Sequence, residues 1–162
     1  MALLNDSKYG LSAQGSDLRL TLLKTGCYPD PYSDHDIHYM SYSLLPHMDG
    51  FRAETVVQPA YRFNYRPVAV DGRLEMAPLF RLDHPGVVCE SVKNAEDVEN
   101  AYVLRLYEAE RNHSRCTLSV SGAKSVWLTN MLEEKQEQLP IENGQVQLRF
   151  RPFEIKTLLV ER

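Results

Sequence analysis

The stretch "QVQLRFRPFEIKTLLVE", residues 145–161, decides the fold class. Apolar side chains occupy every second residue before Pro152, and a similar alternation begins again after it. Such alternation is typical of a β-strand with one buried and one solvated face. The positions that share a face are Val146, Leu148 and Phe150 before the proline, and Phe153, Ile155 and Thr157 after it. Pro152 cannot donate to a strand ladder, so we expect it to mark the turn or edge between two strands.

The same period of two recurs along the chain. "LRLTLL" alternates Leu18, Leu20 and Leu22 with polar residues, and "CTLSVSG" does so with Cys116, Leu118 and Val120. Asn143-Gly144 is the strongest turn signal and Ser121-Gly122 a weaker one, because these residues tolerate positive φ. From Val87 onward the pattern predicts strands at 87–92, 102–109, 115–121, 124–131, 145–150 and 153–160. This short, even spacing indicates a small antiparallel β-sandwich.

The first half of the chain is less regular. The tyrosine-rich stretch 38–46 predicts a long strand, and helical spacing predicts a short helix over 51–58. Pro59 is costly in a helix interior, so we expect that helix to end or bend there. Residues 64–86 have only short apolar runs and predict a connection between β layers. The fold class is therefore all-β, an antiparallel β-sandwich with one short helix in the first half, and we place a domain boundary between residues 85 and 86.

Composition narrows the function classes. The 162 residues carry a formal net charge of -4 at pH 7, and the basic residues are scattered singly. We therefore expect neither nucleic acid nor an anionic membrane surface as a partner. No apolar run approaches the roughly 20 residues of a membrane span, and the start lacks a signal-peptide pattern, so we expect a cytoplasmic protein. The three cysteines, Cys27, Cys89 and Cys116, lack zinc-knuckle spacing and predict buried free thiols.

The most metal-like cluster is "DPYSDHDIH", which holds Asp34, His35, Asp36 and His38. Histidines three residues apart lie on opposite faces of an extended strand. Zinc sites usually draw ligands from separate segments, so we interpret this cluster as a solvated loop and predict no metal site in the chain.

Other chemistry-bearing patterns are weak. The chain has no nucleophile elbow and no glycine-rich phosphate loop, and the acidic runs "EDVEN" and "LEEKQEQ" are typical of a solvated face. We interpret Trp127 as a core residue whose indole N–H meets a backbone carbonyl. The tyrosines leave two readings open: either Tyr39 and Tyr42 divide between core and surface, or they join Tyr28 and Tyr32 in a platform for sugar rings.

Seven segments, taken in chain order, carry a resemblance to a known family. They are "ALLNDSKYG", "LRLTLLKTGCYPDPYSD", "HYMSYSLLPH", "ESVKNAED", "YVLRLYEAE", "VWLTNMLEE" and "RPFEIKTLLVE". In this order they resemble the C-terminal β domains of glycoside hydrolase family 38, the α-mannosidases. The resemblance implies that residues 1–85 end the large β-sandwich region and that residues 86–162 form a small C-terminal antiparallel β-sandwich. It also implies that this chain is the tail of a longer enzyme.

By the same resemblance, catalysis belongs elsewhere in that enzyme. Family members hold a catalytic zinc and an aspartate nucleophile in an N-terminal domain, and no position here corresponds to either. The parent would be a zinc-dependent, retaining α-mannosidase that uses two carboxyl groups. This chain alone is expected to be inactive, with no catalytic residue and no cofactor of its own.

The resemblance places the loop "NDSKYG" near the sugar pocket of the family. It implies substrate contacts for Asn5, Asp6, Lys8 and Tyr9, whose side chains supply donors and acceptors for hydroxyl groups. Alternatively, Asp6 binds backbone N–H groups of its own turn while Gly10 supplies an unusual φ.

The expected partners are the catalytic domain of the same mannosidase and a mannose-containing oligosaccharide, with self-association of the detached chain. Two other functions stay open. The chain could be a free-standing module that binds mannosides without cleaving them, or a structural fragment without activity.

Overall fold

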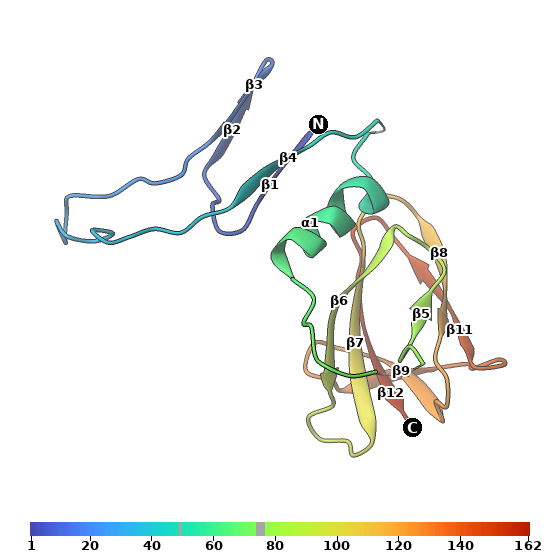
Figure 1. Ribbon diagram of the computed structural model, residues 1–162. Coiled ribbons are helices and arrows are strands. Elements are labelled where there is room, and N and C mark those ends of the chain that lie inside the picture. The colour runs from blue at the N-terminus through green and yellow to red at the C-terminus, as the bar shows by residue number, and fades with distance from the viewer. Residues whose placement is uncertain (49, 74–76) are drawn as a thin grey trace. The chain divides into compact units, whose positions relative to one another are not determined.

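The computed structural model describes residues 1–48, 50–73 and 77–162 (Figure 1). The chain forms two compact units. The N-terminal unit comprises Met1–Met48 and Gln58–Val68, and the sandwich unit comprises Asp49–Val57 and Ala69–Arg162. The domain boundary between residues 85 and 86 stays a prediction. The predicted connection over 64–86 includes residues 74–76, which lie outside the described residues.

Two antiparallel sheets make up most of the sandwich unit (Figure 1). The larger sheet has the order β10-β9-β12-β7-β6, with bounds Lys135–Leu139, Ser125–Thr129, Ile155–Glu161, Ala101–Glu108 and Val87–Asn94. The smaller sheet has the order β11-β8-β5, with bounds Gln145–Phe150, Ser114–Ser119 and Arg81–Leu82. Neighbouring strands pair antiparallel throughout. The predicted all-β antiparallel sandwich is therefore confirmed.

The core lies between these two sheets. The larger sheet contributes Leu104, Leu106, Val126, Leu158 and Val160, and the smaller sheet contributes Cys116, Leu118, Val146, Leu148 and Phe150. Strand β11 shows the predicted alternation directly, because its buried residues alternate with exposed glutamine and arginine side chains. Strand β7 has a neighbour on each side and is also buried on its outer face, where Ala101 and Val103 pack with Leu159 and Trp127. Fully burying one such leucine stabilises the fold by about 2 kcal/mol.

All six strands predicted from Val87 onward are present, with ends shifted by a few residues. Strand β10 is not predicted by the sequence, because its acidic, glutamine-rich stretch is typical of a solvated face. It is a mostly exposed edge strand that pairs only with β9 and contains a register shift between Lys135 and Glu137. Polar residues on both faces of an edge strand remove the alternation by which a strand is recognised.

Turns occur where the sequence predicts them. Asn143 and Gly144 adopt φ of 52° and 73°, and the flanking Glu142 and Gln145 exchange two backbone hydrogen bonds of 2.9 Å. This tight turn leads from one sheet into the other, because β10 and β11 belong to different sheets. Gly122, with φ of 74°, likewise lies between β8 and β9 of different sheets. Pro152 lies in the turn between β11 and β12, as predicted.

The N-terminal unit contains two small sheets. Strand β1 (Ala2–Asn5) pairs with β4 (Tyr42–Leu45), and β2 (Leu11–Gln14) pairs with β3 (Asp17–Leu20). The long strand predicted over 38–46 is wrong in extent, because the strand covers only the four residues of β4.

The helical segment also differs from the prediction. A π-helical turn, η1 (Ala53–Val57), leads directly into helix α1 (Gln58–Asn64). Pro59 therefore lies in the first turn of α1 and does not end the helix. The proline thus directly follows the change from π-helical to α-helical geometry between Val57 and Gln58.

Candidate functional site

The end of β1 and the loop that follows it contain all four predicted substrate-binding residues. Asn5 ends the strand, and its side-chain oxygen accepts a hydrogen bond from the backbone N–H of Lys8 at 2.7 Å. One oxygen of Asp6 accepts the backbone N–H of Ser41 at 2.9 Å, and the other accepts the hydroxyl of Ser7 at 2.9 Å. Asn5 and Asp6 therefore shape this loop.

The contact between Asp6 and Ser41 bears on one of the two expectations for Asp6, that its carboxylate binds backbone N–H groups of its own turn. The backbone hydrogen bond from Ser41 is the largest cause of the lowered pKa of Asp6. The backbone N–H of Asp6 in turn donates to the carbonyl of Ser41 at 3.2 Å. The carboxylate therefore holds two distant segments together, and the expectation that it serves mainly its own turn is wrong.

Lys8 and Tyr9 present their side chains differently. Tyr9 is 94% exposed, and Lys8 is half-buried. Gly10, expected to supply an unusual φ, does not have a positive φ. Its role is close approach: a Cβ at Gly10 would lie 2.9 Å from the Cβ of Thr21, whose N–H donates to the Gly10 carbonyl at 2.7 Å.

The metal-like cluster lies in a turn-rich loop of the N-terminal unit. The side chains of Asp34, His35 and Asp36 are exposed. His38 uses its Nε2 to bond the backbone carbonyl of Asp34 at 2.8 Å, and Asp34 adopts φ of 61°. Within the described residues, no three His, Cys, Asp or Glu side chains come together as a metal-binding group.

The aromatic residues differ from the predictions. The four tyrosines at 28, 32, 39 and 42 are all exposed, so the division of Tyr39 and Tyr42 between core and surface is wrong. Trp127 packs on the outer face of the larger sheet and not in the main core. Its indole N–H donates to the hydroxyl of Ser125 at 3.0 Å and not to a backbone carbonyl. Lys135 covers the ring at 4.9 Å.

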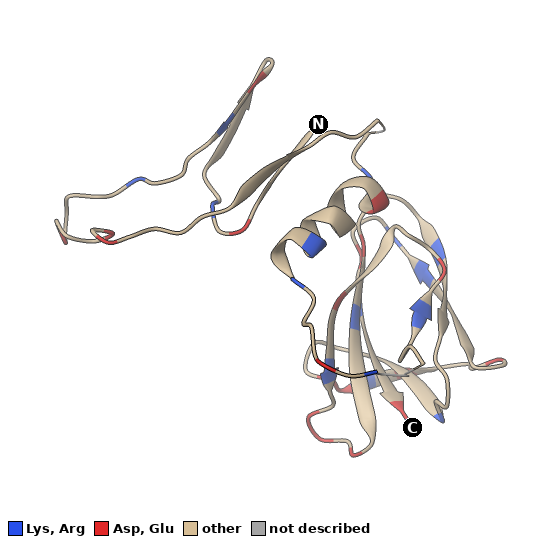
Figure 2. Ribbon diagram, viewed as in Figure 1, with Lys and Arg blue, Asp and Glu red and all other residues tan. Residues whose placement is uncertain are grey.

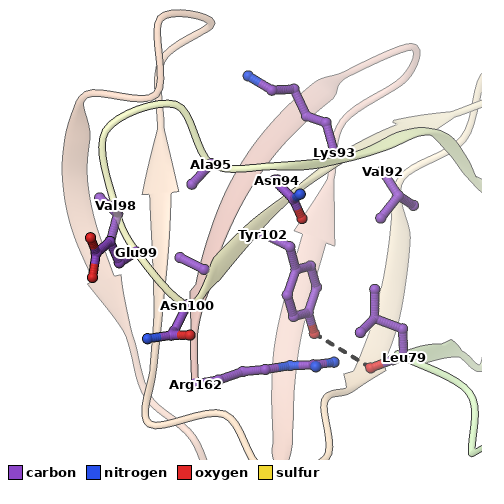
Figure 3. Close-up of a pocket in the computed structure, with 11 residues that line it drawn as sticks. Leu79, Val92, Lys93, Asn94, Ala95, Val98, Glu99, Asn100, Tyr102 and Arg162 are labelled. Carbon is purple, nitrogen blue, oxygen red and sulfur yellow. Dashed lines mark hydrogen bonds between the residues drawn. The ribbon is translucent and has the colours of Figure 1, made fainter.

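The sequence did not indicate a pocket of about 740 Å³ in the sandwich unit (Figure 3). It lies beside the ends of β6 and β7 and the connection between them. Its walls include Leu79, Val92, Asn94, Asn100, Tyr102 and Arg162. The lining is drawn from segments up to 83 residues apart, from Leu79 to Arg162, and no local spacing could have revealed it.

Tyr102 and Arg162 form the polar centre of this pocket. The guanidinium carbon of Arg162 lies 4.9 Å from the centre of the Tyr102 ring. The Tyr102 hydroxyl donates a long hydrogen bond of 3.4 Å to the carbonyl of Leu79 (Figure 3). Burial raises the pKa of Tyr102 by more than the neighbouring Arg162 lowers it, so the phenol is neutral at physiological pH.

Comparison with known proteins adds the family context. Residues 86–158 match the family model described as the glycosyl hydrolases family 38 C-terminal β-sandwich domain. Residues 1–32 match the model of the glycosyl hydrolases family 38 C-terminal domain. The all-β fold and the two family-model matches together define the class of this protein, which is a β domain of a glycosyl hydrolase. The chain belongs to glycoside hydrolase family 38 and corresponds to its C-terminal β region.

Curated relatives agree over nearly the whole chain. It is 36% identical over 170 residues to alpha-mannosidase 2C1 of Homo sapiens, covering 99% of this chain and 16% of that protein. It is 29% identical over 168 residues to alpha-mannosidase G of Dictyostelium discoideum, covering 97% of this chain and 15% of that protein. The chain therefore spans about one sixth of the length of these relatives.

Two further findings bear on the expected partners. Acidic and basic side chains are interspersed over the sandwich unit, without a basic stripe among the described residues (Figure 2). No described helix has the length and hydropathy that a membrane span requires.

Proposed function

We propose that this chain is the C-terminal, non-catalytic β portion of an α-mannosidase and that it packs on the catalytic domain of that enzyme. The names of its relatives support the activity class, and the match over about one sixth of their length supports a role as one part of a longer enzyme. The parent would hydrolyse terminal α-mannosides, in keeping with carbohydrate metabolism in the cytoplasm.

One observation carries the packing proposal: the hairpin of β2 and β3 has an exposed apolar face. Leu11 lies opposite Leu20, and Ala13 lies opposite Leu18. Residues directly opposite in an antiparallel pair point to the same face of a sheet. Leu11 is 60% exposed and Leu18 is 46% exposed. The other face carries Ser12, Gln14, Asp17 and Arg19.

Such a hairpin needs a partner to be stable. An isolated two-stranded hairpin is marginal in water, and a buried apolar face is what normally stabilises it. Burying one leucine contributes about 1.5 to 3 kcal/mol. A surface on the parent enzyme that covers this face would supply that stabilisation. Without it, two copies of the hairpin can cover each other, so we expect the detached chain to self-associate.

The loop after β1 is the part of this chain that we propose lines the sugar pocket. Asn5 and Asp6 fix its shape through Lys8 N–H and Ser41 N–H. The highly exposed phenol of Tyr9 is then available to a sugar ring, and the ammonium group of Lys8 is available to the hydroxyl groups of that ring. In this proposal Asn5 and Asp6 act as positioning residues, whereas Lys8 and Tyr9 touch a mannose-containing oligosaccharide.

The zinc and the aspartate nucleophile come from the family resemblance and belong to a domain outside this chain. The described residues hold no three potential ligands that could form a metal centre, so they do not fit the zinc. We therefore derive no catalytic step for them.

A second candidate is a free-standing mannoside-binding module. The observation that favours it is the exposure of Tyr28, Tyr32 and Tyr39 at 91%, 75% and 88%. Exposed aromatic rings supply large contact area to a ligand at small entropy cost. Titration of the purified chain with mannose and a short α-mannoside tests this: binding that Tyr39→Ala abolishes, without hydrolysis, would favour the module.

A chimeric enzyme tests the main proposal. In human alpha-mannosidase 2C1, the 170-residue matching region is replaced by this chain, and hydrolysis of a chromogenic α-mannoside is measured. A form lacking the region and a form carrying the matching mouse region are the controls. We expect activity from the chimera and none from the deletion.

The proposal would be overturned by an inactive chimera alongside an active mouse replacement, or by full activity of the deletion. Leu11→Ser in the chimera should lower the yield of folded active enzyme at least severalfold. Ser12→Asn, on the opposite face of the same strand, should leave it unchanged.

A further inference from the structure

The pocket beside Tyr102 contains a cation, Arg162, that forms no salt bridge with a side-chain carboxylate of the described residues. Its guanidinium contacts the ring and hydroxyl of Tyr102. A guanidinium has five N–H donors, and one neutral phenol oxygen can accept only a minority of them. As far as the described residues go, the remaining donors have no side-chain acceptor and can serve one that enters the pocket.

The other charged groups around the pocket are arranged differently. Lys93 is paired with Glu133 and with Glu96, the latter at 3.4 Å, so its charge is already neutralised. Figure 3 shows the carboxylate of Glu99 on the opposite side of the pocket from the Arg162 guanidinium. The region beside Arg162 and the Tyr102 hydroxyl is therefore the electropositive part of the pocket.

Neutral polar groups and apolar walls complete the lining. Asn94 and Asn100 contribute side-chain amides, and neither amide has a hydrogen-bond partner among the described residues. Leu79 and Val92 supply apolar wall. Ligand sites commonly combine such walls with a few convergent polar groups in a volume of about 300 to 1,000 Å³.

We propose that this pocket binds a small ligand bearing a phosphate or carboxylate group, with the oxyanion held by Arg162 and the body of the ligand held by Asn94 and Asn100. Guanidinium matches planar or tetrahedral oxyanions through two parallel hydrogen bonds. The stacking of Arg162 on Tyr102 holds the guanidinium in place before the ligand arrives. The two amides donate to and accept from hydroxyl groups of that ligand.

Calorimetric titration of the purified chain at constant ionic strength tests the site. The probes are inorganic phosphate, mannose 6-phosphate and glucuronic acid, with mannose as the neutral control. We expect at least one oxyanion probe to bind more tightly than mannose. Whether the phosphates or the uronic acid bind identifies the source of the oxyanion.

Arg162→Gln should weaken that binding roughly tenfold or more, because hydrogen bonds to a charged group contribute about 1.5 to 3 kcal/mol. Arg149→Gln removes an equal charge from an exposed position on β11, outside the pocket, and should leave binding unchanged. Circular dichroism tests whether both variants fold. If Arg162→Gln does not fold, Arg162→Lys takes its place. Equal weakening by both variants, or no oxyanion binding by the wild-type chain, would overturn the proposal. This test involves no catalytic domain, so its failure is distinguishable from failure of the proposed mannosidase role.

Discussion

The carboxylate of Glu108 accepts a hydrogen bond from the backbone N–H of Phe153 at 3.1 Å, across 45 residues of sequence. Its other oxygen accepts the N–H of Glu110 at 2.9 Å. Glu108 is completely buried, at the end of β7. This one side chain therefore ties the turn after β7 to the turn that precedes β12.

Glu108→Ala should destabilise the sandwich unit by about 3 kcal/mol, because two backbone donors would lose their acceptor inside the protein. The free energy of unfolding in urea is the measurement. Glu137→Ala removes an exposed carboxylate from β10 and is the matched control. Its effect should stay within about 0.5 kcal/mol. Equal effects of the two variants would show that the buried hydrogen bonds contribute little.

Acid should destabilise this unit. Burial alone would raise the pKa of Glu108, but the backbone N–H groups of Phe153, Glu110, Asn112 and Arg111 together outweigh it and lower that pKa below 4.5. The side chain of Lys135 is the largest cause of the lowered pKa of Glu161. Depressed carboxyl pKa values contribute stability that is present above about pH 4.5 and is lost as the pH falls through the folded values.

The urea midpoint should therefore fall between pH 5 and pH 3. The difference in urea midpoint between the wild type and Glu108→Gln should become smaller over the same pH range, because protonation of Glu108 removes the charge that distinguishes the two proteins. If the difference in urea midpoint stays constant with pH, carboxyl groups other than Glu108 cause the pH dependence.

Gly10→Ala should open the base of the β2–β3 hairpin. The added methyl would meet the Cβ of Thr21 at 2.9 Å, closer than real Cβ contacts come. We expect faster hydrogen exchange at the Thr21 amide, which donates to the Gly10 carbonyl. Gly26→Ala, whose nearest contact is 3.7 Å, is the control in the same unit. Adding Thr21→Gly to the Gly10→Ala variant removes the clashing Cβ and should restore slow exchange. Exchange that stays fast would show that the clash is not the cause.

Self-association of the detached chain should depend on the apolar face of the hairpin. Leu11→Ser with Leu18→Ser should weaken association at least tenfold, measured by sedimentation equilibrium, because each leucine contributes about 1.5 kcal/mol or more on burial. Ser12→Asn changes the opposite face and should have little effect. Unchanged association in the leucine variant would place the contact elsewhere.

The three cysteines should differ in reactivity. Burial raises the pKa of Cys89 and of Cys116 to about 11, whereas Cys27 is exposed. The thiolate is the reactive form, so a maleimide at pH 8 should modify Cys27 at least tenfold faster. Cys27→Ser should remove the fast phase and keep the slow ones. A fast phase that persists would show that a second thiol is accessible.

These cysteines also show where the sequence prediction was too uniform. Buried thiols were expected at all three positions, yet only Cys116 is fully buried and Cys89 is half-buried. Cys116 lies in an alternating strand, which indicates its burial. Cys27 lies in a segment without regular structure, where no periodicity reports on packing.

The predicted site residues show a similar division. The polar side chains of these residues made it predictable that they form hydrogen bonds. The partner of Asp6 was not predictable, because Ser41 lies 35 residues further along the chain. The pocket around Tyr102 and Arg162 was not predictable at all, because its residues approach each other only after the sheets have formed.

Local patterns in the sequence determined the strands of the C-terminal sandwich, the Asn143-Gly144 turn and the family. Alternation and positive-φ residues act through neighbours along the chain, and they are readable without a fold. Tertiary structure decided that β10 is a strand, that Glu108 is buried and paired, and that the leucines of the β2–β3 hairpin remain exposed. Each of these depends on which distant groups supply a hydrogen-bond partner or an apolar surface, and only the folded chain settles that.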